Sequence, residues 1–88
     1  MNGPKHLCVD NDDTVIIADA ESHLVRRYDP KTGLITRIAG TGKQGSAGVG
    51  GDPAQCQVSR PHGVIVHPAT GELYITDSYN NRVLKIVK

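Results

Sequence analysis

The apolar residues of this chain fall into short runs that are separated by glycine, proline, asparagine and aspartate. Runs of this length between turn-forming residues are typical of β-strands. They predict strands at about residues 6–10, 14–19, 23–28, 34–39, 63–67, 72–77 and 82–87. Apart from one turn at 53–57, no segment has helical periodicity. The pattern therefore predicts an all-β protein of about seven antiparallel strands.

The two groups of strands are copies of one repeat. Residues 4–10 align with 61–67, residues 15–19 with 73–77, and residues 22–28 with 80–86. The identical pairs are Pro4/Pro61, Val9/Val66, Ile17/Ile75, Asp19/Asp77 and Val25/Val83. A fixed-period repeat indicates a repeat architecture. We expect a first unit at 1–40, a connector at 41–60 and a second unit at 61–88 that lacks a fourth strand.

The second strand of each unit is apolar on consecutive residues, as in Val15-Ile16-Ile17-Ala18. Such a run suits a strand that is covered on both faces. The third and fourth strands are more polar, so polarity rises from the first strand of a unit to its last. A propeller blade has this gradient of polarity, because its inner strands pack between neighbouring blades and its outer strand is exposed to solvent.

Residues 60–66 (RPHGVIV) and 71–83 (GELYITDSYNNRV) resemble an NHL repeat, and Ser22-His23-Leu24 stands where that family has its Asn-His-Leu tripeptide. Residues 40–42 and 48–54 are similar to the glycine-rich connector between NHL blades, in which an Asp usually stands at the place of Val49. The resemblance implies two blades of a β-propeller. It also implies a protein-binding platform, although some members bind RNA.

Two blades leave an apolar face on each side, and propellers have about four to eight blades. We therefore expect completion to a six-bladed, or less favourably an eight-bladed, ring. Either three or four copies of the chain would assemble head to tail, or the blades are part of a longer chain.

Most of the chain's ten glycines lie between residues 40 and 60. This segment is either a flexible linker or an ordered loop at one rim of the propeller, and we favour the loop. The same rim would gather a binding surface for a protein or small ligand. Its residues would be Arg60, His62, His23, Tyr79, Asn80 and Asn81. Asp19 and Asp77 end second strands, and we expect each to accept a backbone N–H two residues on and fix the turn.

The histidines are the only metal or acid–base candidates. His6 and His62 begin inner strands, so a metal would need a ring of copies to supply further ligands. We expect solvated or turn-packing histidines instead. The sequence contains neither the motif of a serine triad nor that of a P-loop. We thus expect a noncatalytic scaffold with no catalytic residue, metal or cofactor. The alternative is part of a propeller enzyme, of the metal-dependent lyase or lactonase type, with a site in the central channel.

Composition and charge limit the classes of partner and the cellular compartment that we expect for this chain. The net charge is +1, with ten Lys and Arg against nine Asp and Glu, so a nucleic-acid partner is not favoured. No apolar stretch has the length of a membrane span, and residues 1–4 do not resemble a signal peptide. Cys8 and Cys56 lack metal-ligand spacing, and free thiols indicate a reducing, cytoplasmic setting.

Overall fold

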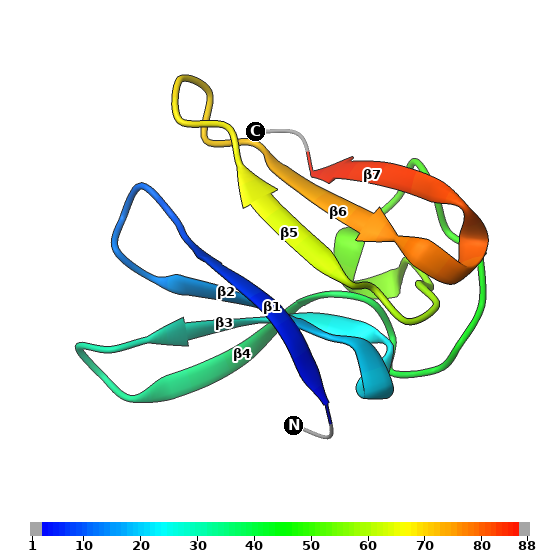
Figure 1. The fold of residues 1–88 in the computed structure, drawn as a ribbon, viewed down its shortest axis with the longest axis horizontal. Coiled ribbons are helices and arrows are strands. Elements are labelled where there is room, and N and C mark those ends of the chain that lie inside the picture. The colour runs from blue at the N-terminus through cyan, green and yellow to red at the C-terminus, as the bar shows by residue number, and fades with distance from the viewer. Residues whose placement is uncertain (1–2, 87–88) are drawn as a thin grey trace.

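The computed structural model describes residues 3–86 and contains two antiparallel sheets (Figure 1). The first sheet has the strands β1 (Pro4–Val9), β2 (Val15–Asp19), β3 (Leu24–Asp29) and β4 (Leu34–Ala39). The second sheet has β5 (Gly63–Val66), β6 (Leu73–Asp77) and β7 (Arg82–Ile86). In both sheets each strand pairs with the next along the chain. Short 3₁₀ turns lie at η1 (Ala20–Ser22), η2 (Pro53–Gln55) and η3 (Ser78–Asn80).

These elements confirm the predicted all-β fold of seven antiparallel strands. Strand bounds shift by a few residues, and residue 87, which we assigned to the last strand, lies outside the described residues. The turn predicted at 53–57 is the 3₁₀ turn η2. Within residues 3–86, no helix is long and apolar enough to cross a membrane.

Strand register shows that the two sheets are equivalent position by position. Leu7 pairs with Ile17 in the first sheet, as Val64 pairs with Ile75 in the second. One strand further, Ala18 pairs with Val25, as Thr76 pairs with Val83. Because strand neighbours alternate between faces, equivalent residues of the two sheets point to equivalent faces.

The core lies between the two sheets, whose innermost strands β1 and β5 run side by side (Figure 1). The first sheet contributes Ile16, Ala18, Val25 and Ala39, and the second contributes Val64, Val66, Leu73 and Ile75. Each sheet therefore covers one face of the other. The opposite faces keep large apolar side chains in solvent, including Leu7, Val9, Ile65 and Val83.

The glycine-rich connector is ordered against both sheets. The Gly40 N–H donates to the carbonyl of Pro53 at 3.1 Å, and the Gln57 N–H donates to the carbonyl of Ala47 at 2.8 Å. Gly40 has a φ of +85°, and a side-chain Cβ there would lie 2.6 Å from the carbonyl oxygen of His23. Glycine is thus required at this position, where β4 has ended and the connector begins. Val58, near the other end of the connector, is buried.

Both cysteines are free thiols. Cys8 is half-buried at the edge of the core, and burial, together with the nearby Asp10 carboxylate, raises the pKa of its thiol. A raised pKa keeps the thiol protonated and unreactive near neutral pH. Cys8 therefore acts as a small apolar side chain.

The ordered connector predicts a strong contrast between two valines of that segment. Val58→Ala deletes two buried methyl groups and should lower the free energy of unfolding by about 2 kcal/mol. Val49→Ala makes the same deletion at an exposed position and should change it by less than about 0.5 kcal/mol. Urea denaturation of both variants measures the difference. Equal effects would contradict a packed connector.

Candidate functional site

One end of the two sheets collects side chains from the turn between β2 and β3, from η3 and from the segment that leads into β5. We call the group Glu21, His23, Arg60, His62 and Tyr79 the rim cluster. Glu21 and His23 come from the first sheet's β2–β3 turn, whereas Tyr79 comes from the equivalent turn of the second sheet. Arg60 and His62 lie on the segment that enters β5. The rim cluster thus spans the boundary between the sheets.

Arg60 joins the two sheets through both its backbone and its side chain. Its N–H donates to His23 Nδ1 at 3.1 Å, and its guanidinium Nη1 lies 2.6 Å from Glu21 Oε1. Its φ is +46°, although it is not glycine and it precedes Pro61. A non-glycine residue in the left-handed region is strained, and such strain persists where surrounding contacts hold it. The contacts to Glu21 and His23 supply that restraint.

An aromatic surface lies beside this contact. The rings of His62 and Tyr79 are stacked, with centroids 6.3 Å apart and planes 19° apart. The guanidinium carbon of Arg60 lies 5.3 Å from the centroid of the Tyr79 ring, within the range of a cation–π interaction. Both rings are exposed. The cluster therefore presents a cation, a carboxylate and an aromatic face to solvent.

The two imidazoles of the cluster differ in which ring nitrogen carries the proton when the ring is neutral. His62 Nδ1 lies 2.6 Å from the Arg60 carbonyl, which can only accept, so Nδ1 carries a proton and Nε2 of the neutral ring is an acceptor. His23 Nδ1 accepts from the Arg60 N–H, so Nε2 of the neutral ring is a donor. The cluster can therefore offer both a donor and an acceptor to a ligand.

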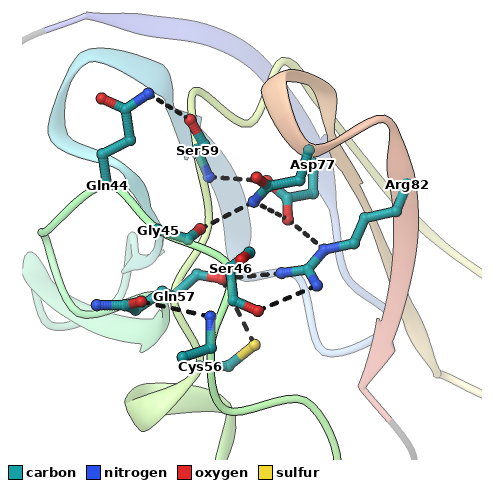
Figure 2. A network of polar contacts seen from close by, with 10 residues as sticks. Gln44, Gly45, Ser46, Cys56, Gln57, Ser59, Asp77 and Arg82 are labelled. Atoms are coloured by element: carbon teal, nitrogen blue, oxygen red, sulfur yellow. Dashed lines mark hydrogen bonds and ion pairs between the residues drawn. The ribbon is translucent and has the colours of Figure 1, made fainter.

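A buried carboxylate, that of Asp77, holds the segment that leads into the rim cluster, and Figure 2 shows its contacts with Ser59 and Arg82. Asp77 is fully buried and accepts from the Ser59 N–H at 2.7 Å through Oδ1. Its Oδ2 accepts from Asn80 Nδ2 at 2.9 Å and from Arg82 Nε at 2.6 Å. The Tyr79 N–H in turn donates to the Ser59 carbonyl at 3.1 Å. These bonds hold the residue before Arg60 against the turn that carries Tyr79.

The same network binds the connector. The guanidinium of Arg82 also donates to the carbonyls of Ser46 and Gln57, at 3.3 and 3.1 Å (Figure 2). Asn80 Nδ2 donates to the carbonyl of Gly45 at 2.8 Å. Arg82 and Asn80 together therefore satisfy three backbone carbonyls of the connector, those of Gly45, Ser46 and Gln57.

Asp19 has the equivalent role in the first sheet. It is fully buried and accepts from the Gly3 N–H and from Arg26 Nε, both at 3.1 Å. Burial alone would raise the pKa of Asp19, but the hydrogen bonds, first of all that from Arg26, hold this pKa below its ordinary value. Neither Asp19 nor Asp77 caps the turn that follows it. The predicted N–H two residues on was the wrong donor, because both carboxylates point back to the segment that enters the first strand.

The structure brings together Arg60, His62, His23 and Tyr79 of the residues assigned to the rim. Asn80 lies in the Asp77 network, and Asn81 closes the η3 turn through its backbone N–H. His6 does not join the rim cluster; its Nδ1 accepts from the Val64 N–H at 3.2 Å, between the innermost strands. Among residues 3–86, no three His, Cys, Asp or Glu side chains converge as a metal site requires.

Sequence reasoning missed the arginine partners of the buried carboxylates. Arg26 follows Asp19 by seven residues, and Arg82 follows Asp77 by five. An aspartate at the end of one strand and an arginine in the next antiparallel strand could have indicated each ion pair. The pairs were not recognised because their spacing differs, so the two arginines do not align in the repeat.

The comparison with known families decides what these sheets are. The family model for the NHL repeat matches residues 1–28 and 58–86. The chain belongs to the NHL-repeat family. Each match covers the first three strands of one sheet, so the two sheets are NHL blades and the predicted resemblance is confirmed.

Two curated proteins show the same relationship. The NHL blades are 31% identical over 77 residues to Protein SUPPRESSOR OF QUENCHING 1, chloroplastic, of Arabidopsis thaliana, which covers 88% of this chain and 7% of that protein. They are 34% identical over 66 residues to NHL repeat-containing protein 2 of Gallus gallus, which covers 74% of this chain and 9% of that protein. The chain thus spans less than a tenth of the length of these relatives.

The Asp77 network predicts a large loss of stability on removal of its carboxylate. Asp77→Ala leaves Arg82 and the Ser59 N–H without their shared partner and should cost about 3 kcal/mol in an NHL blade pair. Asp52→Ala is the matched control, because Asp52 is exposed and its side chain caps η2 by accepting from the Ala54 N–H at 3.0 Å; it should cost about 1 kcal/mol. Chemical denaturation measures both. Equal losses would show that the network does not hold the blade.

The lowered pKa of Asp19 predicts an acid-dependent contribution to stability. The stabilisation is fully present above the ordinary aspartate value of about 4 and is lost as pH falls through the lowered folded-state value. Asp19→Asn should therefore lower Tm at pH 7 and flatten the fall of Tm between pH 4 and pH 2. Calorimetry across this pH range tests the sign. Parallel curves for the variant and the unmodified chain would contradict it.

Proposed function

We propose that these NHL blades form a noncatalytic interaction scaffold and that the rim cluster is its binding surface. The observation that carries the proposal is the stack of Arg60, Tyr79 and His62, which is exposed although it is held by contacts from both blades. Exposed aromatic and arginine side chains are the residues that most often anchor protein interfaces. Rigid positioning supports binding further, because little side-chain entropy is then lost.

The chemistry of the cluster suits an extended peptide. Glu21 offsets the charge of Arg60, so the surface is not selective for a strongly charged ligand. His62 offers an acceptor and His23 a donor, which match the alternating N–H and C=O groups of a peptide backbone. The Tyr79 ring offers an apolar face for a side chain of the peptide. Loops on a rigid scaffold are a common place for such sites.

A phage-displayed peptide library tests the proposal. Peptides selected on the unmodified chain should bind His62→Ala at least about tenfold more weakly, because that variant removes the acceptor and the stack on Tyr79. His67→Ala is the matched control: His67 is also exposed but follows β5 at the opposite end. It should leave the affinity unchanged in a fluorescence titration.

Two results would overturn the proposal. One is a library that yields no peptide specific for the folded chain. The other is a set of peptides whose affinity falls equally for His62→Ala and His67→Ala, since binding would then lie elsewhere. Circular dichroism of each variant shows whether a loss of binding reflects a loss of fold.

A further inference from the structure

Two histidines of the first blade bind backbone amides of the second blade. His23 Nδ1 accepts from the Arg60 N–H at 3.1 Å, and His6 Nδ1 accepts from the Val64 N–H at 3.2 Å. Both donors lie on the segment that leads into β5 and begins it, so both bonds cross the boundary between the blades. We call these two bonds the histidine seam.

An imidazole can accept such a bond only while it is neutral. A protonated ring carries a hydrogen on both nitrogens and has no acceptor left, so the new Nδ1–H points at the N–H of Arg60 or Val64. Histidine is the side chain that ordinarily takes up a proton between about pH 5 and pH 8. His6 is exposed and His23 is half-buried, so protons reach both rings without unfolding of the blades.

The charges beside His23 are paired with one another. Glu21, on the turn before His23, has its Oε1 2.6 Å from Arg60 Nη1, the cation that faces this turn from the second blade. Asp19, at the start of the same turn, is paired with Arg26 of β3 at 3.1 Å. A proton on His23 therefore adds a positive charge that none of these carboxylates is left to compensate, at the place where the ring meets the backbone of Arg60.

The surroundings of His6 also lack a negative partner. Lys5 precedes it on β1, and His62 and Tyr74 line the same hollow from the second sheet. Within residues 3–86, no carboxylate lines this hollow. Protonation of His6 would place a cation there and would leave the N–H of the buried Val64 without its acceptor.

The backbone of Arg60 favours release once the bond to His23 is lost. Its φ is +46°, although it precedes Pro61, and a residue before proline prefers extended backbone. The bond to His23 is the restraint across the boundary that acts on its N–H. Without that bond, Arg60 is held to the first blade by the exposed ion pair with Glu21, and such pairs contribute little.

Other contacts at the boundary do not require a neutral imidazole. His62 Nδ1 donates to the Arg60 carbonyl and keeps this bond when the ring is protonated. At the opposite end of the sheets, Asn11 Nδ2 donates to the Pro68 carbonyl at 3.2 Å, and neither group titrates. The aliphatic core between the sheets is equally insensitive to pH. Loss of the histidine seam therefore loosens the rim end of the boundary and leaves the rest closed.

We propose that the histidine seam is a proton-sensitive joint between the two blades. While His6 and His23 are neutral, both bonds form and the joint is closed. Below about pH 6 both rings become protonated, and the segment that enters β5 is released from the first blade. The joint contributes stability that is fully present at neutral pH and is lost on acidification. It does not depend on the rim cluster as a binding surface, because both bonds lie within the chain itself.

NMR spectroscopy of the unmodified chain tests the joint at the atoms concerned. Between pH 8 and pH 5, the amide protons of Arg60 and Val64 should shift upfield in step with the titration of the His23 and His6 rings. The Ser59 amide, which donates to a carboxylate, should stay in place.

Thermal unfolding gives the corresponding change in stability. Tm should fall by about 5 °C or more between pH 8 and pH 5, the effect of two lost hydrogen bonds in a domain of this size. Aspartate and glutamate ordinarily stay ionised over this range, so the fall reports on the histidines.

Asparagine variants separate the bond from the titration. Asparagine Oδ1 is attached to Cγ, as Nδ1 is in histidine, so it can accept the same N–H at any pH. The double variant His6→Asn with His23→Asn should therefore keep a nearly constant Tm between pH 8 and pH 5. Asparagine suits the left-handed backbone of position 23, because Asn81 has a φ of +53° at the equivalent position of the second blade.

His67→Asn is the matched control. His67 Nδ1 also accepts a backbone N–H, that of Ala69 at 3.2 Å, but this bond lies within one exposed turn and does not cross the boundary. The variant should show the same fall of Tm as the unmodified chain.

Three outcomes would overturn the proposal. Amide protons of Arg60 and Val64 that do not move while both rings titrate would show that the bonds are independent of the charge of the rings. Rings of His6 and His23 that stay neutral down to pH 5 would show that the joint does not open in this range. An equal fall of Tm in the double asparagine variant would assign the pH dependence to other groups.

The NMR titration decides the question even if the double variant does not fold, because it uses the unmodified chain. No peptide is present in any of these measurements. Failure of the proposed peptide site would therefore leave their results unchanged, and failure of the joint would leave the peptide site untouched at neutral pH.

Discussion

A carboxylate buried at the end of the second strand of each blade is the interaction on which the rest of the structure depends. Asp19 and Asp77 each bind the backbone N–H of the residue that leads into the first strand, and each binds an arginine of the third strand. In each blade, one carboxylate at the end of the second strand thus connects the segment before the first strand with the third strand. In the second blade the same carboxylate, through Arg82, also fixes the connector. The geometry of the rim follows from this anchoring, because Arg60 comes directly after the anchored Ser59.

The second constraint is that a blade is too thin to bury both of its faces by itself. The core contains aliphatic side chains from one face of each sheet, and the other faces carry exposed apolar side chains such as Leu7 and Val83. A consecutive apolar run such as Val15-Ile16-Ile17-Ala18 places apolar side chains on both faces of its strand. Within residues 3–86, each sheet covers one of the two faces of the other. The pattern belongs to an architecture in which every blade has two neighbours.

The strands and the repeat were predictable because their signals are local. Apolar runs and turn residues mark strands within a few positions, and the register of Leu7 and Val64 follows from the alignment of the repeat. The gathering of Arg60, His62, His23 and Tyr79 was predictable from blade topology alone. The partners of Asp77 were not, because Ser59 is 18 residues away in a segment without periodicity. The left-handed backbone of Arg60 was hidden for a similar reason, since contacts with the other blade impose it against the preference of a residue before proline.

The unequal size of the two sheets has a consequence for the periphery. Within the described residues β3 is flanked by β4, whereas β7 pairs only with β6, so the backbone amides and carbonyls along its other side point outward. Open backbone of this kind is a template on which foreign strands can add and fibrils can start. Arg82 lies on this strand but pairs with the buried Asp77, so the exposed charge of the strand is that of Lys85, whose Nζ lies 3.8 Å from Glu72 Oε2. A lysine on an open edge disfavours pairing with a like strand, and Lys85 therefore gives this edge some protection against misassembly.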